Sequence, residues 1–271
     1  MKKSFLITLV SILLFFTLNL ISLAQVQKIS LADIKEIKKV HQLNVGIRAK
    51  AKSINSDFLV FSKNLKETKK VPLVIYLHGA GGRGNNIESI TGQVAPLWRG
   101  IVKNIDTPCI VVAPQCLREA RGGGRGGWKY EELNEWLNQL KATLPIDLKR
   151  IYLTGNSMGG YGSWLWGGNS PEHFAAIAPI VGGIGPGGPK DVTKELDEWA
   201  KNLAKVPVYA FAGAKDKVVP AERSERMVAA IQKAGGKLAK IKVYPNEGHG
   251  AKRLVLSSEE FYKWMFSKKR K

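Results

Sequence analysis

Short apolar runs alternate with amphipathic stretches from about residue 71 to the C-terminal end of the chain. The apolar runs have the length and β-branched content of buried strands, and they cover 71–78, 107–114, 149–154, 174–181, 206–213 and 240–245. The stretches between and after them have helical periodicity, at 87–103, 130–143, 157–168, 191–204, 220–234 and 258–266. Continuous apolar strands that alternate with helices are typical of a parallel sheet covered on both faces. We therefore predict an α/β protein with a mostly parallel sheet.

The region before residue 71 has a different pattern. Residues 25–44 are amphipathic and basic, and two further stretches, 45–51 and 57–62, look like strands. Neither an internal repeat nor a linker-like change of composition interrupts the chain. We expect one catalytic domain over residues 25–271.

The first residues, "MKKSFLITLVSILLFFTLNLISLAQVQ", place two lysines before an apolar run from Phe5 to Leu23. Small residues follow at Ser22 and Ala24, which completes the pattern of a secretory signal peptide. We predict a signal peptide over 1–24 and a secreted or periplasmic protein. An uncleaved membrane anchor is the alternative, because the run is long enough to span a bilayer.

Charge and cysteine content refine this picture. The formal net charge is +20, which favours anionic partners, although lysine-rich solvated helix faces would give the same value. The cysteines are Cys109 and Cys116, and Cys109 falls in a predicted strand. Extended chain would hold them too far apart for a disulfide, so we expect two buried thiols.

One serine stands between glycines at a predicted strand-to-helix turn, in "YLTGNSMGGYGSW" (152–164). Gly155, Ser157 and Gly159 form the G-x-S-x-G pattern, in which a sharp turn presents a nucleophilic hydroxyl above the sheet edge. Bulky residues two places before or after the serine would not fit such a turn. The alternative is a glycine-rich turn with a capping serine.

The partners of such a serine follow it in the order acid, then histidine. Two of the four histidines come after Ser157, and His173 ends a predicted helix, where a surface or capping role explains it. His249 lies in the loop "YPNEGHG" after the last predicted strand. Asp216 follows another strand in "GAKDKVVP", where its carboxylate could orient the imidazole. The remaining candidates, Asp191 and Asp197, fall at a helix start and on a helix face, where capping or solvation explains them.

Backbone donors for an oxyanion are expected in "LHGAGGRGNN" (77–86), after the first strong strand. We assign the N–H groups of Ala80, with Gly81 as the alternative, and of Met158. The loop lacks the G-K-[ST] and G-x-G-x-x-G patterns of nucleotide sites. The chain has no H-E-x-x-H motif, so we expect neither a metal nor another cofactor.

Together, "LHGAGGRG", "VVAPQC", "RIYLTGNSMGGYGSW", "FAAIAPIVGG", "GAKDKVVP" and "YPNEGHG" resemble the secreted bacterial α/β-hydrolases of the predicted peptidase and phospholipase/carboxylesterase-like group. These are similar to feruloyl and acetyl-xylan esterases and to polyhydroxybutyrate depolymerases. The resemblance runs from about Val71 to His249. It implies an α/β-hydrolase fold with an eight-stranded sheet and a triad of Ser157, Asp216 and His249. The chain departs from the group at "LREARGGGRGG", which bears on substrate choice.

The resulting hypothesis is a serine esterase that acts on small esters or acylated polysaccharide, with Trp128 as a weaker candidate for substrate binding. One alternative is a serine peptidase of the prolyl-oligopeptidase type. Another is a non-catalytic glycan-binding protein on the same fold. The segment "RGGGRGG" beside Trp128 has the composition of a nucleic-acid-binding tract, but one short segment behind a signal peptide is weak support, and we expect no nucleic-acid partner. A membrane partner is expected only if the signal segment is retained. The sequence leaves the oligomeric state open.

Overall fold

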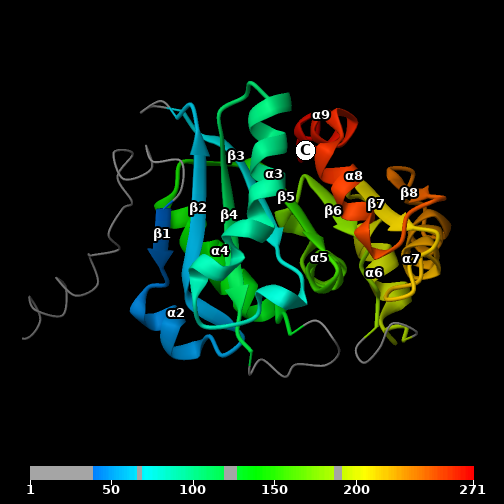
Figure 1. Cartoon of the computed structure of the whole chain (residues 1–271), viewed down its shortest axis with the longest axis horizontal. Coiled ribbons are helices and arrows are strands. Elements are labelled where there is room, and N and C mark those ends of the chain that lie inside the picture. Colours follow the sequence, from blue (N-terminus) through cyan, green and yellow to red (C-terminus); the bar gives the residue numbers. More distant parts are fainter. Residues whose placement is uncertain (1–38, 66–68, 119–126, 186–190) are drawn as a thin grey trace, which may run out of the picture.

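The structure is a computed structural model that describes residues 39–65, 69–118, 127–185 and 191–271. One eight-stranded sheet runs through the molecule in the order β1-β2-β4-β3-β5-β6-β7-β8, which Figure 1 shows from left to right. The strands are β1 (Lys39–Gln42), β2 (Ile54–Lys63), β3 (Val71–Leu77), β4 (Cys109–Cys116), β5 (Ile146–Asn156), β6 (Ala176–Ile180), β7 (Val208–Gly213) and β8 (Ala239–Tyr244).

The sheet is mostly parallel, as the apolar strand pattern predicts. The pairs β1–β2 and β2–β4 are antiparallel, and every pair from β4 to β8 is parallel. Parallel strands are buried on both faces, and β3, β4, β6 and β7 are buried along their whole length. All carboxyl ends of the parallel strands therefore meet at one edge of the sheet, which is where open α/β sheets bind ligands.

Helices cover both faces, and the buried residues separate into two clusters accordingly. One face packs against α2 (Val45–Lys50), α4 (Tyr130–Thr143), α5 (Met158–Asn169), α6 (Leu196–Leu203) and α7 (Glu222–Lys233). The other packs against α3 (Thr91–Asn104), α8 (Lys252–Ser257) and α9 (Glu259–Phe266). Short 3₁₀ turns are η2 (Ala80–Gly82), η3 (Ile87–Ile90), η4 (Pro171–His173) and η5 (His249–Ala251). The predicted α/β-hydrolase architecture is confirmed.

Helix α4 shows how the sequence pattern produces this packing. Leu133, Trp136, Leu137 and Leu140 recur at helical spacing and are all fully buried. Burial of such a side chain contributes about 2 kcal/mol each through the hydrophobic effect. Helix α4 occupies residues 130–143, the range that the sequence predicts.

Some predicted boundaries are wrong. Residues 45–51 were expected to be a strand, but 45–50 form helix α2, because the Asn44 side chain accepts the Ile47 N–H and caps the helix. Helix α6 occupies only 196–203 of the predicted 191–204, and both β1 and α8 are elements that the sequence pattern missed. The signal peptide prediction falls outside the described residues. No helix in the described part of the chain has the length and apolar character needed to cross a membrane.

The two cysteines are free and buried at opposite ends of β4, as expected. Burial raises the pKa of the Cys109 and Cys116 thiols to about 12. Both therefore stay neutral at ordinary pH.

Candidate active site

The turn between β5 and α5 holds Ser157 in a conformation that non-glycine residues rarely adopt. Its φ is 55° and its ψ is −118°. Such a backbone costs on the order of 1–3 kcal/mol and persists only when the surroundings hold it. Here the Ser157 N–H donates to the Ile180 carbonyl on β6 at 2.9 Å, and the Tyr161 N–H donates to the Ser157 carbonyl at 3.0 Å. The turn thus tilts the serine side chain out of the sheet at its carboxyl edge.

The flanking glycines are required because β3 passes directly against the turn. A Cβ at Gly155 would lie 2.6 Å from the Leu77 carbonyl oxygen, and a Cβ at Gly159 would overlap the same oxygen. The first turn of α5 therefore lies on the end of β3. This is the steric reason for the two glycines that the sequence pattern anticipates.

Three side chains from separate segments form one hydrogen-bonded chain at this edge. Ser157 Oγ lies 2.8 Å from His249 Nε2, and His249 Nδ1 lies 2.8 Å from Asp216 Oδ2. Asp216 follows β7, and His249 begins η5 after β8. The structure therefore brings together the three residues that the sequence order selects.

The Asp216 side chain is held in place by backbone hydrogen bonds in addition to its contact with His249. Its other oxygen, Oδ1, accepts the N–H groups of Val218 at 2.8 Å and Val219 at 2.9 Å. Its side chain is fully buried, whereas that of His249 is 29% exposed. The Asp216 carboxylate accepts a hydrogen bond from the Nδ1–H group, so the ring takes the tautomer whose Nε2 accepts a hydrogen bond from the serine hydroxyl. This arrangement suits proton transfer from Ser157.

The loop after β3 approaches the same turn. Residues 80–82 form η2, in which Ala80 and Gly81 are exposed. The neighbouring N–H groups are engaged: Gly79 donates to Gln93 Oε1 and Gly82 donates to the Gly79 carbonyl, both at 2.9 Å. The N–H groups of Ala80 and Gly81 thus remain the candidate donors of this loop.

Met158 is the first residue of α5, and first-turn N–H groups have no acceptor inside their own helix. A Cβ at Gly159 would also come within 3.0 Å of the His78 carbonyl, so the loop and the helix start are in close contact. The sequence-predicted donors on the loop and on α5 therefore belong to one corner of the molecule.

His78 is a structural part of this corner that the sequence reasoning missed. The ring is fully buried, with Nδ1 at 2.7 Å from the Gly79 carbonyl and Nε2 at 2.9 Å from the Cys116 nitrogen. Because the Cys116 N–H donates to Nε2, the proton sits on Nδ1 and donates to Gly79. Burial lowers the pKa of His78 to about 4. A neutral ring thus ties the loop to the end of β4.

Gln115 is a second such residue. Its amide nitrogen lies within 2.9–3.0 Å of the Gly82 carbonyl, the Asn86 carbonyl and Ser89 Oγ. The sequence feature that could have identified His78 and Gln115 is their position, because each stands at or directly after the carboxyl end of a buried strand. A buried polar side chain at such a point must find partners in the adjoining loop.

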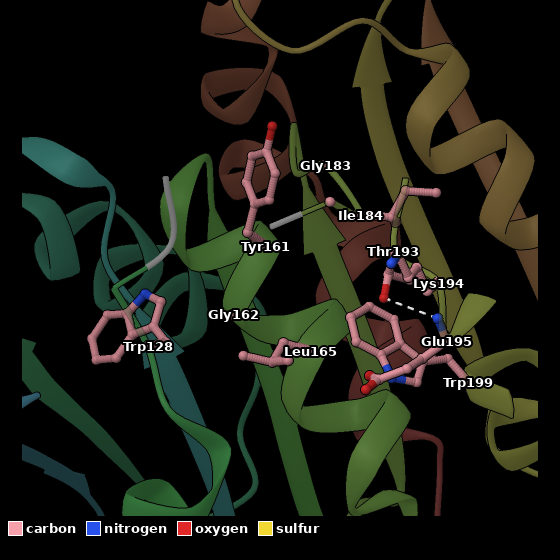
Figure 2. Close-up of a pocket in the computed structure, with 11 residues that line it drawn as sticks. Trp128, Tyr161, Gly162, Leu165, Gly183, Ile184, Thr193, Lys194, Glu195 and Trp199 are labelled. Carbon is pink, nitrogen blue, oxygen red and sulfur yellow. Dashed lines mark hydrogen bonds between the residues drawn. The ribbon is translucent and has the colours of Figure 1, made fainter. Parts of the chain in front are cut away.

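Trp128, the candidate substrate-binding residue, lines a cavity of about 310 Å³ on the outer side of α5. Figure 2 shows it facing α5 from one side, while Ile184 and Trp199 come from the other. The indole is buried and contacts the His78 ring edge-on at a centroid distance of 5.1 Å. Tyr161, one helical turn past Ser157, lines the same cavity.

A second cavity, of about 350 Å³, borders the η2 loop. It is lined by Ala80, Gly81, Arg83 and Arg118. Two arginines therefore line the cavity that the candidate oxyanion donors also line. Such a lining favours a negatively charged group on a ligand.

The residues that the sequence set aside lie elsewhere. His173 is in η4 with its Nδ1 at 3.2 Å from Lys141 Nζ, and Asp197 is exposed on α6. Asp191 is half-buried and precedes α6, not at its start as expected. Among the described residues, no cluster of three or more histidine, cysteine or acidic side chains is placed to hold a metal.

Comparison with known proteins places this geometry in context. Residues 129–254 match the model of the Dienelactone hydrolase family. A Salmonella typhimurium (strain LT2) protein that carries the name carboxymethylenebutenolidase is 33% identical over 109 residues, which cover 38% of this chain and 37% of that protein. An Aspergillus terreus protein named as a feruloyl esterase C is 27% identical over 117 residues, which cover 43% of this chain and 42% of that protein. The chain therefore spans well under half the length of these relatives.

Solved structures give a longer match. The crystal structure of a thermostable esterase is 29% identical and has a TM-score of 0.67, with 79% of this chain and 59% of that chain covered. A ferulic acid esterase has a TM-score of 0.63 at 18% identity, over 85% of this chain and 98% of that chain, which shows the fold alone. The resemblance to esterases and related hydrolases with the α/β-hydrolase fold is confirmed.

Proposed function

We propose that this protein is a serine hydrolase that cleaves carboxylic esters through an acyl-enzyme. The observation that carries the proposal is the unbroken chain from Ser157 Oγ through the His249 ring to Asp216, with both contacts at 2.8 Å. A hydroxyl, an imidazole and a buried carboxylate in this order can activate the oxygen as a nucleophile. The likeness to esterases supports the reaction class.

In the first step, His249 Nε2 takes the Ser157 proton while Oγ attacks the ester carbonyl carbon. The imidazolium that forms is stabilised by the Asp216 carboxylate, which stays ionised. His249 then protonates the leaving alkoxide, and the acyl group remains on Ser157. His249 then deprotonates a water molecule, which attacks the acyl carbon. The bond between that carbon and Ser157 Oγ breaks, His249 returns the proton to Oγ, and the acid is released.

The tetrahedral intermediate carries a negative oxygen that needs fixed donors. We assign the N–H groups of Ala80 and Met158 to it, with Gly81 as the alternative loop donor. Loss of one such donor typically raises the barrier by about 3 kcal/mol. His78 and Gln93 would then act as positioning residues, because they hold the loop that carries the donor.

Esters with an acidic group are the substrates that the surroundings favour. Arg83 and Arg118 line the cavity beside the oxyanion donors, so an anionic group near the ester would meet two guanidinium groups there. Trp128 and Tyr161 would form the apolar wall for the other part of the substrate. An acylated acidic polysaccharide and a small anionic ester both fit this description.

The test is labelling with a fluorophosphonate probe together with hydrolysis of p-nitrophenyl acetate. The protein should do both, and Ser157→Ala should lose the label and at least about 10⁴-fold in kcat. Ser163→Ala is the matched control, since Ser163 is a buried serine on α5 whose hydroxyl donates to the Gly159 carbonyl at 2.8 Å. Retention of activity by folded Ser157→Ala would refute the proposal.

Ester and amide analogues of one acyl group would separate an esterase from a peptidase. We expect the ester to be cleaved much faster, whereas comparable rates would favour the peptidase reading.

The proposed location is outside the cytoplasm, after removal of residues 1–24. The support is the sequence pattern alone, with Lys2 and Lys3 before the apolar run and Ala24 at its end. Mature protein recovered from the expressing cell should begin at Gln25. An intact N-terminus in membranes would indicate an anchor instead.

A further inference from the structure

A groove lies at the opposite edge of the sheet, where β6, β7 and β8 begin. Its volume is about 670 Å³. The walls come from η4, from the residues that lead into the three strands, and from the C-terminal segment 269–271. The hydrolase site at the carboxyl edge makes no use of this feature.

The rim of the groove is strongly basic. Five cationic side chains line it, namely Lys205, Lys237, Lys269, Arg270 and Lys271. Among the lining residues Glu172 is the one with an acidic side chain. Like charges gathered in this way repel one another, and an anionic partner would relieve that repulsion.

The C-terminal segment is held against the protein. The Arg270 N–H donates to the Lys149 carbonyl at 2.8 Å, and its guanidinium donates to the carbonyls of Glu172 and Leu148. The Tyr152 hydroxyl donates to the Lys268 carbonyl at 2.9 Å. The basic side chains therefore start from a fixed backbone, which lowers the entropy lost when a partner binds.

The positive charge of the C-terminal segment also acts on Lys141, which lies near the groove. Burial, followed by the charge of Arg270, lowers the pKa of Lys141, which lies beside His173.

Apolar groups accompany the charges. Phe174, Val206 and Pro207 lie in the floor, and Leu238 on the rim is 56% exposed. Leu148, whose carbonyl is bonded by Arg270, is 43% exposed. Exposed leucines among lysines are the combination by which a protein surface enters the headgroup region of a bilayer.

Single-stranded nucleic acids are bound differently, by exposed aromatic rings that stack on the bases. The one aromatic residue that lines the groove is Phe174, and it is only 2% exposed. The lining therefore disfavours single-stranded nucleic acid, and the exposed Leu238 and Leu148 beside the cations favour a lipid surface.

We propose that the groove and its basic rim are a docking surface for a bilayer that contains anionic lipids. The cations would contact the headgroups while Leu238 and Leu148 enter the interface. Ser157, Asp216 and His249 follow the carboxyl ends of their strands, so the docked protein would hold the hydrolase site away from the bilayer. The inference is independent of the reaction that this site performs.

The experiment is co-sedimentation of the full chain with vesicles of phosphatidylcholine, with or without phosphatidylglycerol. The apolar run 5–23 would bind both kinds of vesicle. The informative quantity is therefore the affinity for vesicles with phosphatidylglycerol divided by the affinity for vesicles of phosphatidylcholine alone. Each cation near an anionic surface contributes about fivefold. The double variant Lys205→Gln/Lys237→Gln should lower the ratio by about 25-fold at low salt, and salt should weaken the binding of the unmodified chain.

The double variant Lys50→Gln/Arg99→Gln is the matched control, because it removes two exposed charges from α2 and α3. Its ratio should change little. Leu238→Ser should weaken binding at high and low salt alike. Equal ratios for the groove variant and the control would overturn the proposal. So would groove-dependent binding to polygalacturonate without any preference for the phosphatidylglycerol vesicles over phosphatidylcholine alone, which would assign the groove to an acidic polysaccharide.

Discussion

The two edges of the sheet are built on different principles. At the carboxyl edge, Ser157 and Val181 both have positive φ, and the glycines around the serine leave no room for a Cβ. At the amino edge, basic side chains such as Lys205 and Lys237 stand exposed, and neither of these residues has a positive φ. The first edge depends on positions fixed to a fraction of an ångström, and the second depends on net charge. Substitutions of similar size should therefore have very unequal effects.

The largest effect is expected for Asp216→Asn. The new side chain keeps an oxygen for the Val218 and Val219 N–H groups, so the fold should be retained. Its NH₂ group would donate to His249 Nδ1 and force the proton onto Nε2, the wrong tautomer for accepting the serine proton. We expect kcat for p-nitrophenyl acetate to fall by about 10⁴-fold, with the free energy of unfolding changed by less than about 1 kcal/mol. A kcat within tenfold of the original would contradict the assigned role of Asp216.

Gly159→Ala should have the largest effect on stability. The added methyl group would overlap the Leu77 carbonyl oxygen, which belongs to β3 and cannot move freely. We expect the free energy of unfolding to fall by about 4 kcal/mol or more, measured by urea denaturation.

Gly92→Ala is the matched control for this substitution. Gly92 is exposed near the start of α3, and a Cβ there would have no neighbour within 4 Å. The alanine should stabilise the protein by about 0.5–1 kcal/mol through its helix propensity. Similar losses in both variants would show that the contact with β3 is not what requires glycine.

The buried ring of His78 predicts a pH dependence of stability. Its pKa is about 4 in the folded protein against 6.5 as the ordinary value. The unfolded chain therefore binds a proton that the folded protein does not bind, so stability is fully present above pH 6.5 and falls as the pH drops toward 4. The loss attributable to this ring reaches about 3 kcal/mol. Urea denaturation of His78→Gln between these pH values should show a shallower decline, and an identical decline would contradict the prediction.

How much of this the sequence could predict depends on the range of the interactions. The strands and the order Ser157, Asp216, His249 were predictable because each carries its own local pattern, an apolar run followed by a polar residue. Helix α2 was missed because the capping bond from Asn44 competes with an alternating pattern that also suits a strand.

The supporting residues were not predictable in this way. His78 and Gln115 act through contacts across 38 and 33 residues, with Cys116 and Gly82 respectively. Their role exists only once β3 and β4 lie side by side, which no local pattern encodes. Likewise the sequence showed that lysines were abundant, but only the fold gathers those of three segments around one groove.

An effect of intermediate size is expected at Arg83, smaller than that of Asp216→Asn and larger than that of the groove variant Lys205→Gln/Lys237→Gln. Its guanidinium lines the cavity beside Ala80 and Gly81. Arg83→Gln should lower kcat/KM about tenfold for an ester with a carboxylate, such as a p-nitrophenyl hemisuccinate, and leave p-nitrophenyl acetate nearly unchanged. Arg83→Lys keeps the charge and should retain most of the preference. Equal losses on both esters would mean that Arg83 supports the loop, through its bond to the Ala80 carbonyl, and does not select substrates.

The smallest effect is expected for Lys205→Gln/Lys237→Gln, and its smallness is informative. Both side chains are exposed, and the rim has five cations against one acidic side chain, so removal of two charges reduces repulsion and breaks no buried contact. The free energy of unfolding should change by no more than about 0.5 kcal/mol, in the stabilising direction at low salt, and the difference should vanish at high salt. Urea denaturation at two salt concentrations measures this. A loss in the free energy of unfolding above about 1 kcal/mol that persists at high salt would show that these lysines stabilise the fold. The amino edge would then depend on specific contacts, as the carboxyl edge does, and not on net charge.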